Sequence, residues 1–320
     1  MMELTTLWSL DRTIDPETGC SPIADAIAAH WDHDPGSVRF FRSSANFIYR
    51  LERDCRPAFL RIAAGSERTR PHIEGEIELL AWLTAEGIPV VQAIPARAGK
   101  MVVTVATPIG EMHAALFDAL PGRLLDLDGM IPEECRTWGA SVGRLHAVLS
   151  NAPDRFRGRP AGWSDALDRA ESGTDHLPGT VRAEAQRLRA VLDTLPQSPE
   201  TYGPIHIDLE LDNLVWNDGT VAILDFDEFG DGWFMLDIAK ALTDPFQEGD
   251  TADSPRIAAF LDGYRAHHPL DDAMLAHLGD FLALSELRGY MSLVRAIDMD
   301  PDDADIEWLR DLIVRLRIWM

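Results

Sequence analysis

The apolar and polar positions in the first third of the chain predict an antiparallel sheet with one main helix. From residue 71 to residue 85 apolar residues recur at helical spacing, and Gly87 and Pro89 end the helix. Short β-rich runs with turn residues between them make up the rest of this part. The predicted strand segments are 38–53, which holds two strands around a polar turn, 57–64, 101–106 and 113–120.

After the Pro-Gly-Arg sequence at 121–123 the apolar period becomes helical, with one exception. The exception is a β-hairpin at 213–226, whose turn is Asn-Asp-Gly. The predicted helices are 132–149, 164–171, 180–195, 235–243, 254–266, 271–296 and 303–318. A sheet-rich front and a helical remainder predict an α+β protein of two lobes. We expect an N-terminal lobe of residues 1–117, a C-terminal lobe of residues 118–320 and a hinge at about 118–122.

The hairpin brings polar side chains together at its open end. If its turn centres on residues 218–219, Asn213 lies opposite Leu224 and next to Asp225, beside the loop that carries Asp208. Amide and carboxylate oxygens are the ligands that Mg²⁺ prefers, with water and substrate phosphates completing its shell. Asp208 is then free to accept a proton from a hydroxyl group.

The segment IHIDLELDNLVWNDGTVAILDF has the spacing H-x-D-x-x-x-x-N, a hairpin and an Asp-Phe pair, which is typical of protein kinases and their relatives. It resembles the aminoglycoside phosphotransferase and choline kinase-like family. The likeness extends to WFMLDIAKAL at 233–242 and to GRLHAVL at 143–149, and spans residues from about 38 to about 295. The resemblance implies a protein kinase-like fold and transfer of the γ-phosphoryl group of ATP to a hydroxyl group of a small molecule.

The resemblance also implies roles for the residues of this segment. Asp208 is expected to be the catalytic base, with His206 beside it in the catalytic loop as a brace. Asn213 and Asp225 are expected to hold Mg²⁺, and Asp237 to tie its helix to the loop.

The N-terminal lobe is then expected to bind the nucleotide. Ser43, Ser44 and Asn46 stand where relatives carry a phosphate-covering loop, although this turn contains no glycine. Backbone groups of Asp118 and Leu120 are expected to pair with adenine, or with guanine if the donor is GTP.

A kinase strand lysine that binds phosphate is replaced here by Arg61. The whole chain has two lysines, Lys100 and Lys240. An arginine binds phosphate with a planar fork rather than a point charge, so the phosphate geometry differs. The helical angle selects Glu76 as the partner of Arg61, because it lies at the margin of the apolar face of helix 71–85.

The residues near the catalytic loop favour an amino-bearing acceptor, such as an aminoglycoside-like, amino alcohol-like or homoserine-like compound. These residues are Glu210, Asp212, Glu228, Asp231 and the aromatic Trp233. Arginines in the same lobe leave a carboxylate-bearing acceptor open. They are Arg155, Arg157, Arg159, Arg288 and Arg295.

The net charge of −24 argues against nucleic acid and against an anionic membrane surface as partners. No run of 18 apolar residues occurs, and no signal peptide is apparent. Three widely spaced cysteines form neither a disulfide framework nor a zinc site. We therefore expect a cytoplasmic protein. The family resemblance implies that its partner is a small-molecule hydroxyl acceptor, and we expect a monomer or homodimer.

Other readings of the sequence stay open at this point. A protein of this fold can be a catalytically weak nucleotide- or partner-binding protein, or a protein Ser/Thr kinase. The strand end AILDFDEFG also resembles the nucleophile motif of haloacid dehalogenase-type phosphatases, but Phe229 stands where that motif needs Thr or Val. A transition-metal site at His206 and Asp208 is disfavoured, because no other His or Cys is near in sequence.

Overall fold

The computed structural model describes residues 2–160, 162–172, 177–298 and 310. Its residues cluster into two compact units. Unit 1 takes its described residues from Met1–Glu78, Val91–Ala119 and Ser292–Met320, and unit 2 consists of Leu79–Val90 and Leu120–Met291. The units are described one at a time.

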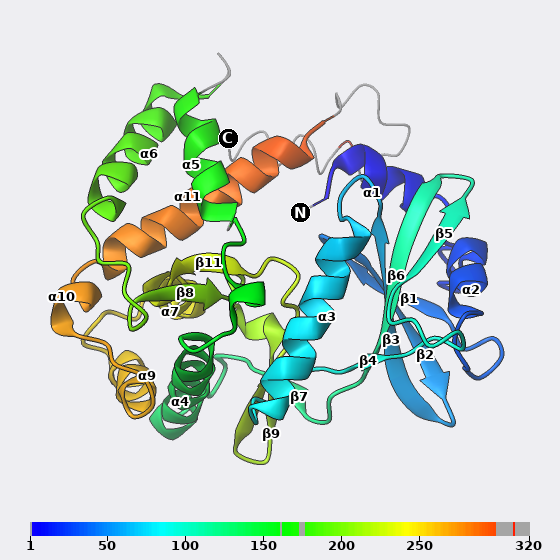
Figure 1. Cartoon of the computed structure of the whole chain (residues 1–320), viewed down its shortest axis with the longest axis horizontal. Coiled ribbons are helices and arrows are strands. Elements are labelled where there is room, and N and C mark those ends of the chain that lie inside the picture. The colour runs from blue at the N-terminus through cyan, green and yellow to red at the C-terminus, as the bar shows by residue number, and fades with distance from the viewer. Residues whose placement is uncertain (1, 161, 173–176, 299–309, 311–320) are drawn as a thin grey trace. The chain divides into compact units, whose positions relative to one another are not determined.

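Unit 1 is built on one antiparallel sheet with the strand order β1-β2-β3-β6-β4, in which β5 also pairs with β6 (Figure 1). The strands are β1 (Arg39–Ser43), β2 (Phe47–Arg53), β3 (Arg56–Ala64), β4 (Ala93–Ile94), β5 (Val103–Thr107) and β6 (Gly110–Asp118). All the strand segments predicted for this part of the chain are confirmed. Successive side chains of a strand point to opposite faces, so the sheet has two different surfaces.

One surface of this sheet carries the core of unit 1. Leu60 and Ile62 of β3 are buried there with residues of two helices, α1 (Leu4–Asp11) and α2 (Pro22–Ala28). The following Trp31 is 1% exposed, and its indole N–H donates to the carbonyl of Ile94 at 2.9 Å. Neither helix was predicted, because seven or eight residues give too few turns for a helical period to stand out.

The other surface of the sheet carries Arg61, which points toward α3 (Arg70–Ala85). This is the helix predicted for residues 71–85. It begins in unit 1, where it carries Glu76. Figure 1 shows α2 and α3 flanking the sheet of unit 1.

Unit 2 is mainly helical, as predicted. Its helices are α4 (Pro132–Leu149), α5 (Gly162–Ser172), α6 (Gly179–Leu192), α7 (Phe234–Ala241), α8 (Thr243–Gln247), α9 (Pro255–Arg265), α10 (Asp272–Leu275) and most of α11 (Leu278–Ala296). The prediction of one helix over 271–296 is wrong, because the chain turns at residues 276–277 between α10 and α11. The helix predicted at 303–318 lies outside the described residues, except for residue 310. Among the helices that the structure describes, none has the length and apolarity needed to span a membrane.

The strands of unit 2 frame the segment predicted to carry the chemistry. The hairpin of β9 (Leu214–Asn217) and β10 (Thr220–Ile223) has the predicted register, with Thr220 opposite Asn217. A third short strand, β7 (Arg123–Leu124), pairs with β9. The strands β8 (Tyr202–Ile205) and β11 (Gly230–Trp233) pair with each other and were not predicted, because each has only four residues and the two lie far apart in sequence.

Helices α4 and α9 lie side by side at unusually short range (Figure 1). A Cβ atom added to Gly139 would lie 1.9 Å from the carbonyl oxygen of Phe260, and one added to Gly143 would lie 2.5 Å from that of Tyr264. Glycine is therefore required at both positions of α4. The close approach brings His146 of α4 to the hydroxyl group of Tyr264.

Candidate active site

The loop after β8 is anchored by one buried carboxylate. Asp237 of α7 accepts the backbone N–H of His206 at 2.8 Å and that of Ile207 at 2.6 Å. Ile207 has a φ of 75°, a left-handed conformation that is costly for a β-branched residue. The two hydrogen bonds to Asp237 hold this conformation, which turns the chain toward Asp208.

A chain of buried hydrogen bonds fixes Asp237. His146 Nε2 lies 3.1 Å from Asp237 Oδ2, and His146 Nδ1 lies 2.8 Å from the hydroxyl of Tyr264. Tyr264 in turn lies 3.1 Å from His268 Nδ1. Burial by itself would raise the pKa of Asp237, but the hydrogen bonds and charges of His146 and His206 together outweigh it and lower the pKa. Asp237 is therefore an anion that accepts from His146 Nε2–H, and His146 Nδ1 accepts from Tyr264.

Burial also sets the protonation of the outer members of this chain. It raises the pKa of Tyr264 well above its ordinary value, so the phenol keeps its proton and donates it to His146. It lowers the pKa of His268 from 6.5 to about 4, so this ring is neutral at pH 7. The network links four buried side chains, and it ends on the backbone of the loop at residues 206–207.

His206 joins the same loop to the hairpin. Its Nε2 lies 2.7 Å from the carbonyl oxygen of Leu224, and its Nδ1 lies 3.2 Å from the backbone N–H of Asp208. Nε2–H therefore donates and Nδ1 accepts. With both nitrogens engaged and the side chain buried, His206 has the geometry of a brace rather than of a proton-transfer group.

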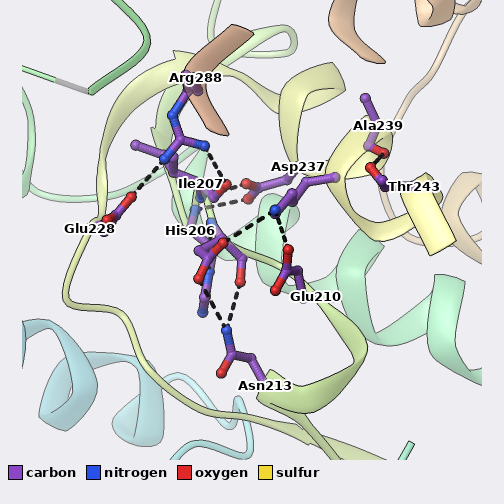
Figure 2. Close-up of polar contacts among 11 residues, drawn as sticks. His206, Ile207, Glu210, Asn213, Glu228, Asp237, Ala239, Thr243 and Arg288 are labelled. Carbon is purple, nitrogen blue, oxygen red and sulfur yellow. Dashed lines mark hydrogen bonds and ion pairs between the residues drawn. The ribbon is translucent and has the colours of Figure 1, made fainter. Parts of the chain in front are cut away.

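Asp208 and Asn213 lie together, as the hairpin geometry predicts. Asn213 Nδ2 donates to the carbonyl oxygen of Asp208 at 2.9 Å and lies 3.5 Å from Asp208 Oδ2 (Figure 2). These contacts orient the side-chain amide of Asn213, because its Nδ2 donates in both of them. The amide oxygen Oδ1 takes part in neither contact. Oδ1 is buried and has no hydrogen-bond partner among the described residues. A buried amide oxygen of this kind fits a metal ligand, because an unsatisfied acceptor is otherwise costly.

Asp225 directly follows the hairpin at its open end. Leu224 N donates to Asn213 O at 2.8 Å, which continues the hairpin register by one pair and brings Asp225 next to Asn213 in the chain path. Asp225 has a φ of 59° and is half-buried. Within the described residues, no three Asp, Glu, His or Cys side chains form a metal cluster. One amide and one carboxylate fit Mg²⁺, which keeps several waters and binds substrate phosphates.

Two cations that were not predicted to act at this loop lie against it. Lys240 of α7 pairs with Glu210, and its Nζ lies 3.5 Å from Asp208 Oδ1. Arg288 of α11 donates to the carbonyl oxygen of Ile207 at 3.1 Å and to Glu228 at 2.6 Å (Figure 2). The spacing of Asp237 and Lys240, three residues apart on one helix, is the sequence signal that could have found Lys240.

The residues predicted to contact the acceptor have mixed surroundings. Glu210 and Glu228 are each paired with a cation of this chain. Burial raises the pKa of Glu210, and the charge of Lys240 opposes that rise. Asp212 is exposed, and Asp231 Oδ2 accepts the backbone N–H of Gly158 at 2.6 Å.

The expectation that Trp233 adds aromatic surface is wrong. Trp233 is 1% exposed, and its indole N–H donates to the carbonyl oxygen of Pro196 at 3.1 Å. The unpredicted pairing of β11 with β8 turns this side chain inward. It packs there against Trp163, Tyr202 and Phe281.

Unit 1 brings together the ion pair that the helical angle selects. Arg61 and Glu76 form a bidentate pair, with Nη1 to Oε1 at 2.9 Å and a second bond from Nη2 to Oε2. Their side chains are only 7% and 1% exposed. The guanidinium also stacks on Phe117 at 4.9 Å from the ring centre. The pair is therefore a rigid, charge-assisted unit.

Aromatic residues on the Arg61 face of the sheet were not predicted as functional. Phe59 lies two residues before Arg61 and opposite Phe117 in the register of β3 and β6. It contacts Phe41 edge to face at 5.3 Å, and Phe41 is 55% exposed. Counting by two from Arg61 along the strand would have identified Phe59.

The remaining nucleotide-site predictions fall on the turn between β1 and β2 and on the end of β6. Ser44 N donates to Asn46 O at 3.1 Å, and the side chain of Asn46 is buried, while Ser43 ends β1. Asp118 N donates to Gln92 O at 3.0 Å, so this N–H group is already engaged. Leu120 is half-buried at the start of a segment of unit 2.

Comparison with known proteins extends over most of the chain. The sequence model of the phosphotransferase enzyme family matches residues 37–284. The amicoumacin kinase of Bacillus subtilis is 27% identical over 287 residues, which are 85% of this chain and 84% of that protein. A homoserine kinase of Methylobacillus flagellatus is 28% identical over 237 residues, which are 71% of this chain and 69% of that protein.

Solved structures show the same fold. An amicoumacin kinase in complex with AMP-PNP, Ca²⁺ and Ami has a TM-score of 0.77 at 23% identity, covering 97% of this chain and 94% of its own. A microcompartment-associated aminopropanol kinase has a TM-score of 0.66 at 23% identity, covering 92% and 94%. The resemblance seen in the sequence and the predicted fold class are confirmed. The chain belongs to the phosphotransferase enzyme family, and its reaction is nucleotide-dependent phosphoryl transfer to a hydroxyl group of a small molecule.

Proposed function

We propose that this protein phosphorylates a hydroxyl group of an amino-bearing small molecule, with Asp208 as the catalytic base. The observation that carries the proposal is the anchored loop. Asp237 fixes the backbone of residues 206–207, and Asn213 contacts Asp208 while its own Oδ1 has no hydrogen-bond partner among the described residues. A base and a candidate metal ligand are thus held together by one rigid framework.

In the proposed reaction, Asp208 accepts the proton of the acceptor hydroxyl as the hydroxyl oxygen attacks the γ-phosphorus. The bond from the γ-phosphorus to the bridging oxygen breaks, and ADP leaves with the electron pair. Most of the rate enhancement in this reaction class comes from positioning and electrostatics. The hydrogen-bond chain from Tyr264 through His146 to Asp237 serves that positioning.

Asn213 Oδ1 and the Asp225 carboxylate would hold the divalent metal. Both are oxygen donors, which supports Mg²⁺ over the softer transition metals. A Mg²⁺ ion bound there supplies charge neutralisation to the nucleotide phosphates.

We assign nucleotide binding to the N-terminal lobe of residues 1–117, and catalysis to residues 118–320. Arg61, held by Glu76, would contact phosphate through its guanidinium. Phe59 and Phe41 offer an aromatic surface on the same face for a purine base. ATP is the proposed donor, and GTP is the alternative to be compared with it.

Two observations support an amino-bearing acceptor. The names of several relatives, aminopropanol kinase and homoserine kinase among them, state acceptors that carry an amino group. Two of the arginines that would suit a carboxylate acceptor are already engaged. Arg157 donates to the carbonyl oxygens of Ala152 and Ser150, and Arg288 is bound to Glu228.

The test begins with thermal unfolding in the presence of Mg²⁺ and ATP or GTP. Nucleotide at 100 times its dissociation constant should add about 2.7 kcal/mol of stability. Asp225→Ala should lose the magnesium-dependent part of that shift. Transfer of labelled γ-phosphate is then measured with L-homoserine, 1-amino-2-propanol and amicoumacin as acceptors.

The role of Asp208 as base and the ability of the protein to transfer phosphate are tested separately. Asp208→Asn should lower transfer by about 10²–10⁴-fold while leaving the nucleotide-induced shift in place. Equal turnover by wild type and Asp208→Asn would remove Asp208 from the role of base. Nucleotide binding without transfer to any acceptor would support a catalytically weak nucleotide-binding protein instead.

A further inference from the structure

We infer that Lys240 is a positioning residue for Asp208 in the phosphoryl transfer, and that Glu210 holds Lys240 in place. The inference rests on the proposed role of Asp208 as base. It concerns a cation that the kinase-like sequence motif does not contain, on a helix outside the catalytic loop.

The position of Lys240 relative to the loop is set by its own helix. Asp237 and Lys240 lie three residues apart on α7 and therefore share one face of the helix. Asp237 binds the amides of His206 and Ile207 on that face. The contact that fixes the loop backbone therefore also places the lysine stem beside the loop side chains.

The ammonium group of Lys240 contacts two carboxylates. Its Nζ lies 3.5 Å from Asp208 Oδ1 and forms a hydrogen bond to Glu210 Oε1. The lysine side chain is 15% exposed, against 39% for Asp208. The limited exposure of the lysine reduces the screening of its charge by salt and water.

The consequence for Asp208 concerns which of its oxygens is available. The last torsion of an aspartate side chain has a broad energy profile, so an unheld carboxylate rotates. Lys240 engages Oδ1, while the hydrogen bond that the structure gives Oδ2 is a long one, from Asn213 Nδ2 at 3.5 Å. Oδ2 is thus the oxygen left to accept the hydroxyl proton, in an orientation fixed before the acceptor binds.

Glu210 explains how the flexible side chain of Lys240 can hold the carboxylate of Asp208 in one orientation. A lysine ends in a point charge on a four-carbon stem with several rotatable bonds. A second contact is needed to keep its Nζ at one place, and Glu210 provides it. Glu210, predicted from the sequence to bind the acceptor, therefore acts in the reaction through Lys240 and Asp208.

The first experiment compares Lys240→Met, Lys240→Arg and Glu210→Gln with the wild type. The matched control is Lys100→Met, because Lys100 is the other lysine of the chain and is exposed. We expect Lys240→Met to lower kcat about 10- to 100-fold, the cost of a small misplacement, with the KM for ATP changed less than about 2-fold. Lys240→Arg should restore part of kcat, Glu210→Gln should lower kcat less than Lys240→Met, and Lys100→Met should match the wild type.

The second experiment asks whether Lys240 acts through Asp208. In the Asp208→Asn background, Lys240→Met should cause no further loss of kcat. Independent, multiplicative losses would show that the lysine acts on the phosphoryl group by itself, which would overturn the inference. Full kcat in Lys240→Met would overturn it as well.

A third measurement requires no activity. The unfolding midpoints of Lys240→Met, Asp208→Asn and the double variant should be non-additive if the two side chains interact. Additive midpoints would overturn the inference. The midpoints of the variants can be non-additive while the wild type phosphorylates no acceptor and hydrolyses no ATP. That result would refute the proposed function and leave the pairing of Lys240 with Asp208 standing.

Discussion

The buried Arg61–Glu76 pair allows a sharp test of unit 1 through the substitution Glu76→Gln. Both side chains are less than 10% exposed, and two hydrogen bonds join them. Removing the charge of Glu76 breaks a buried ion pair by neutralising one partner, which typically costs about 3–5 kcal/mol. At about 2–4 °C per kcal/mol, the unfolding midpoint should fall by about 6–20 °C.

The assay is thermal unfolding without nucleotide, which isolates the structural pair from any binding effect. Glu78→Gln is the matched control, because Glu78 lies on the same helix and is exposed, and it should change stability by no more than about 0.5 kcal/mol. The double variant Arg61→Met/Glu76→Leu should be more stable than Glu76→Gln, since it removes both buried charges. The reasoning is refuted if Glu76→Gln costs no more than Glu78→Gln, or if the double variant is no more stable than Glu76→Gln.

Three further outcomes follow from the helical unit. Gly139→Ala should cost about 3 kcal/mol or more in chemical unfolding, because its Cβ would lie 1.9 Å from Phe260 O, whereas Gly279→Ala, with open space around it, should be neutral or stabilising by about 0.5–1 kcal/mol. In the folded protein the pKa of His268 is lowered from 6.5 to about 4. Between about pH 4 and pH 6.5 the unfolded chain therefore binds a proton at His268 that the folded chain does not bind. Stability should therefore fall as pH drops from about 6.5 to about 4, by at most about 1.4 kcal/mol per pH unit, and His268→Gln should flatten that slope in pH-dependent unfolding. Asp237→Asn should lower kcat by at least about 10-fold in steady-state assays, since an amide replaces the carboxylate that accepts two backbone N–H groups and His146; unchanged turnover would contradict the anchoring role.

Much of the architecture could be predicted because it depends on local patterns. The strand segments of unit 1, helix α3 and the β9–β10 hairpin follow from periodicity and turn residues, and the hairpin register follows from the position of Gly219. That register alone places Asn213 opposite Leu224, the residue before Asp225. Glu76 could also be chosen as the partner of Arg61, because the angle between residues on a helix is fixed.

Short elements and paired strands were missed for a physical reason. α1, α2, β8 and β11 are too short for their own residues to determine their structure, so tertiary packing decides them. The burial of Trp233 is a direct consequence, since it depends on β11 pairing with a strand nearly thirty residues earlier.

The sequence by itself determined which residues are proposed to carry the chemistry, because a catalytic motif is a set of residue types at short, fixed spacings. Asp208, Asn213 and Asp225 are close in the chain, and the hairpin between them is a local structure. Only the tertiary structure decided which residues from other helices hold that motif in place and which cations lie beside it. Lys240, Arg288 and the His146–Tyr264 chain reach it from other helices, and no local pattern specifies contacts made across such sequence distances.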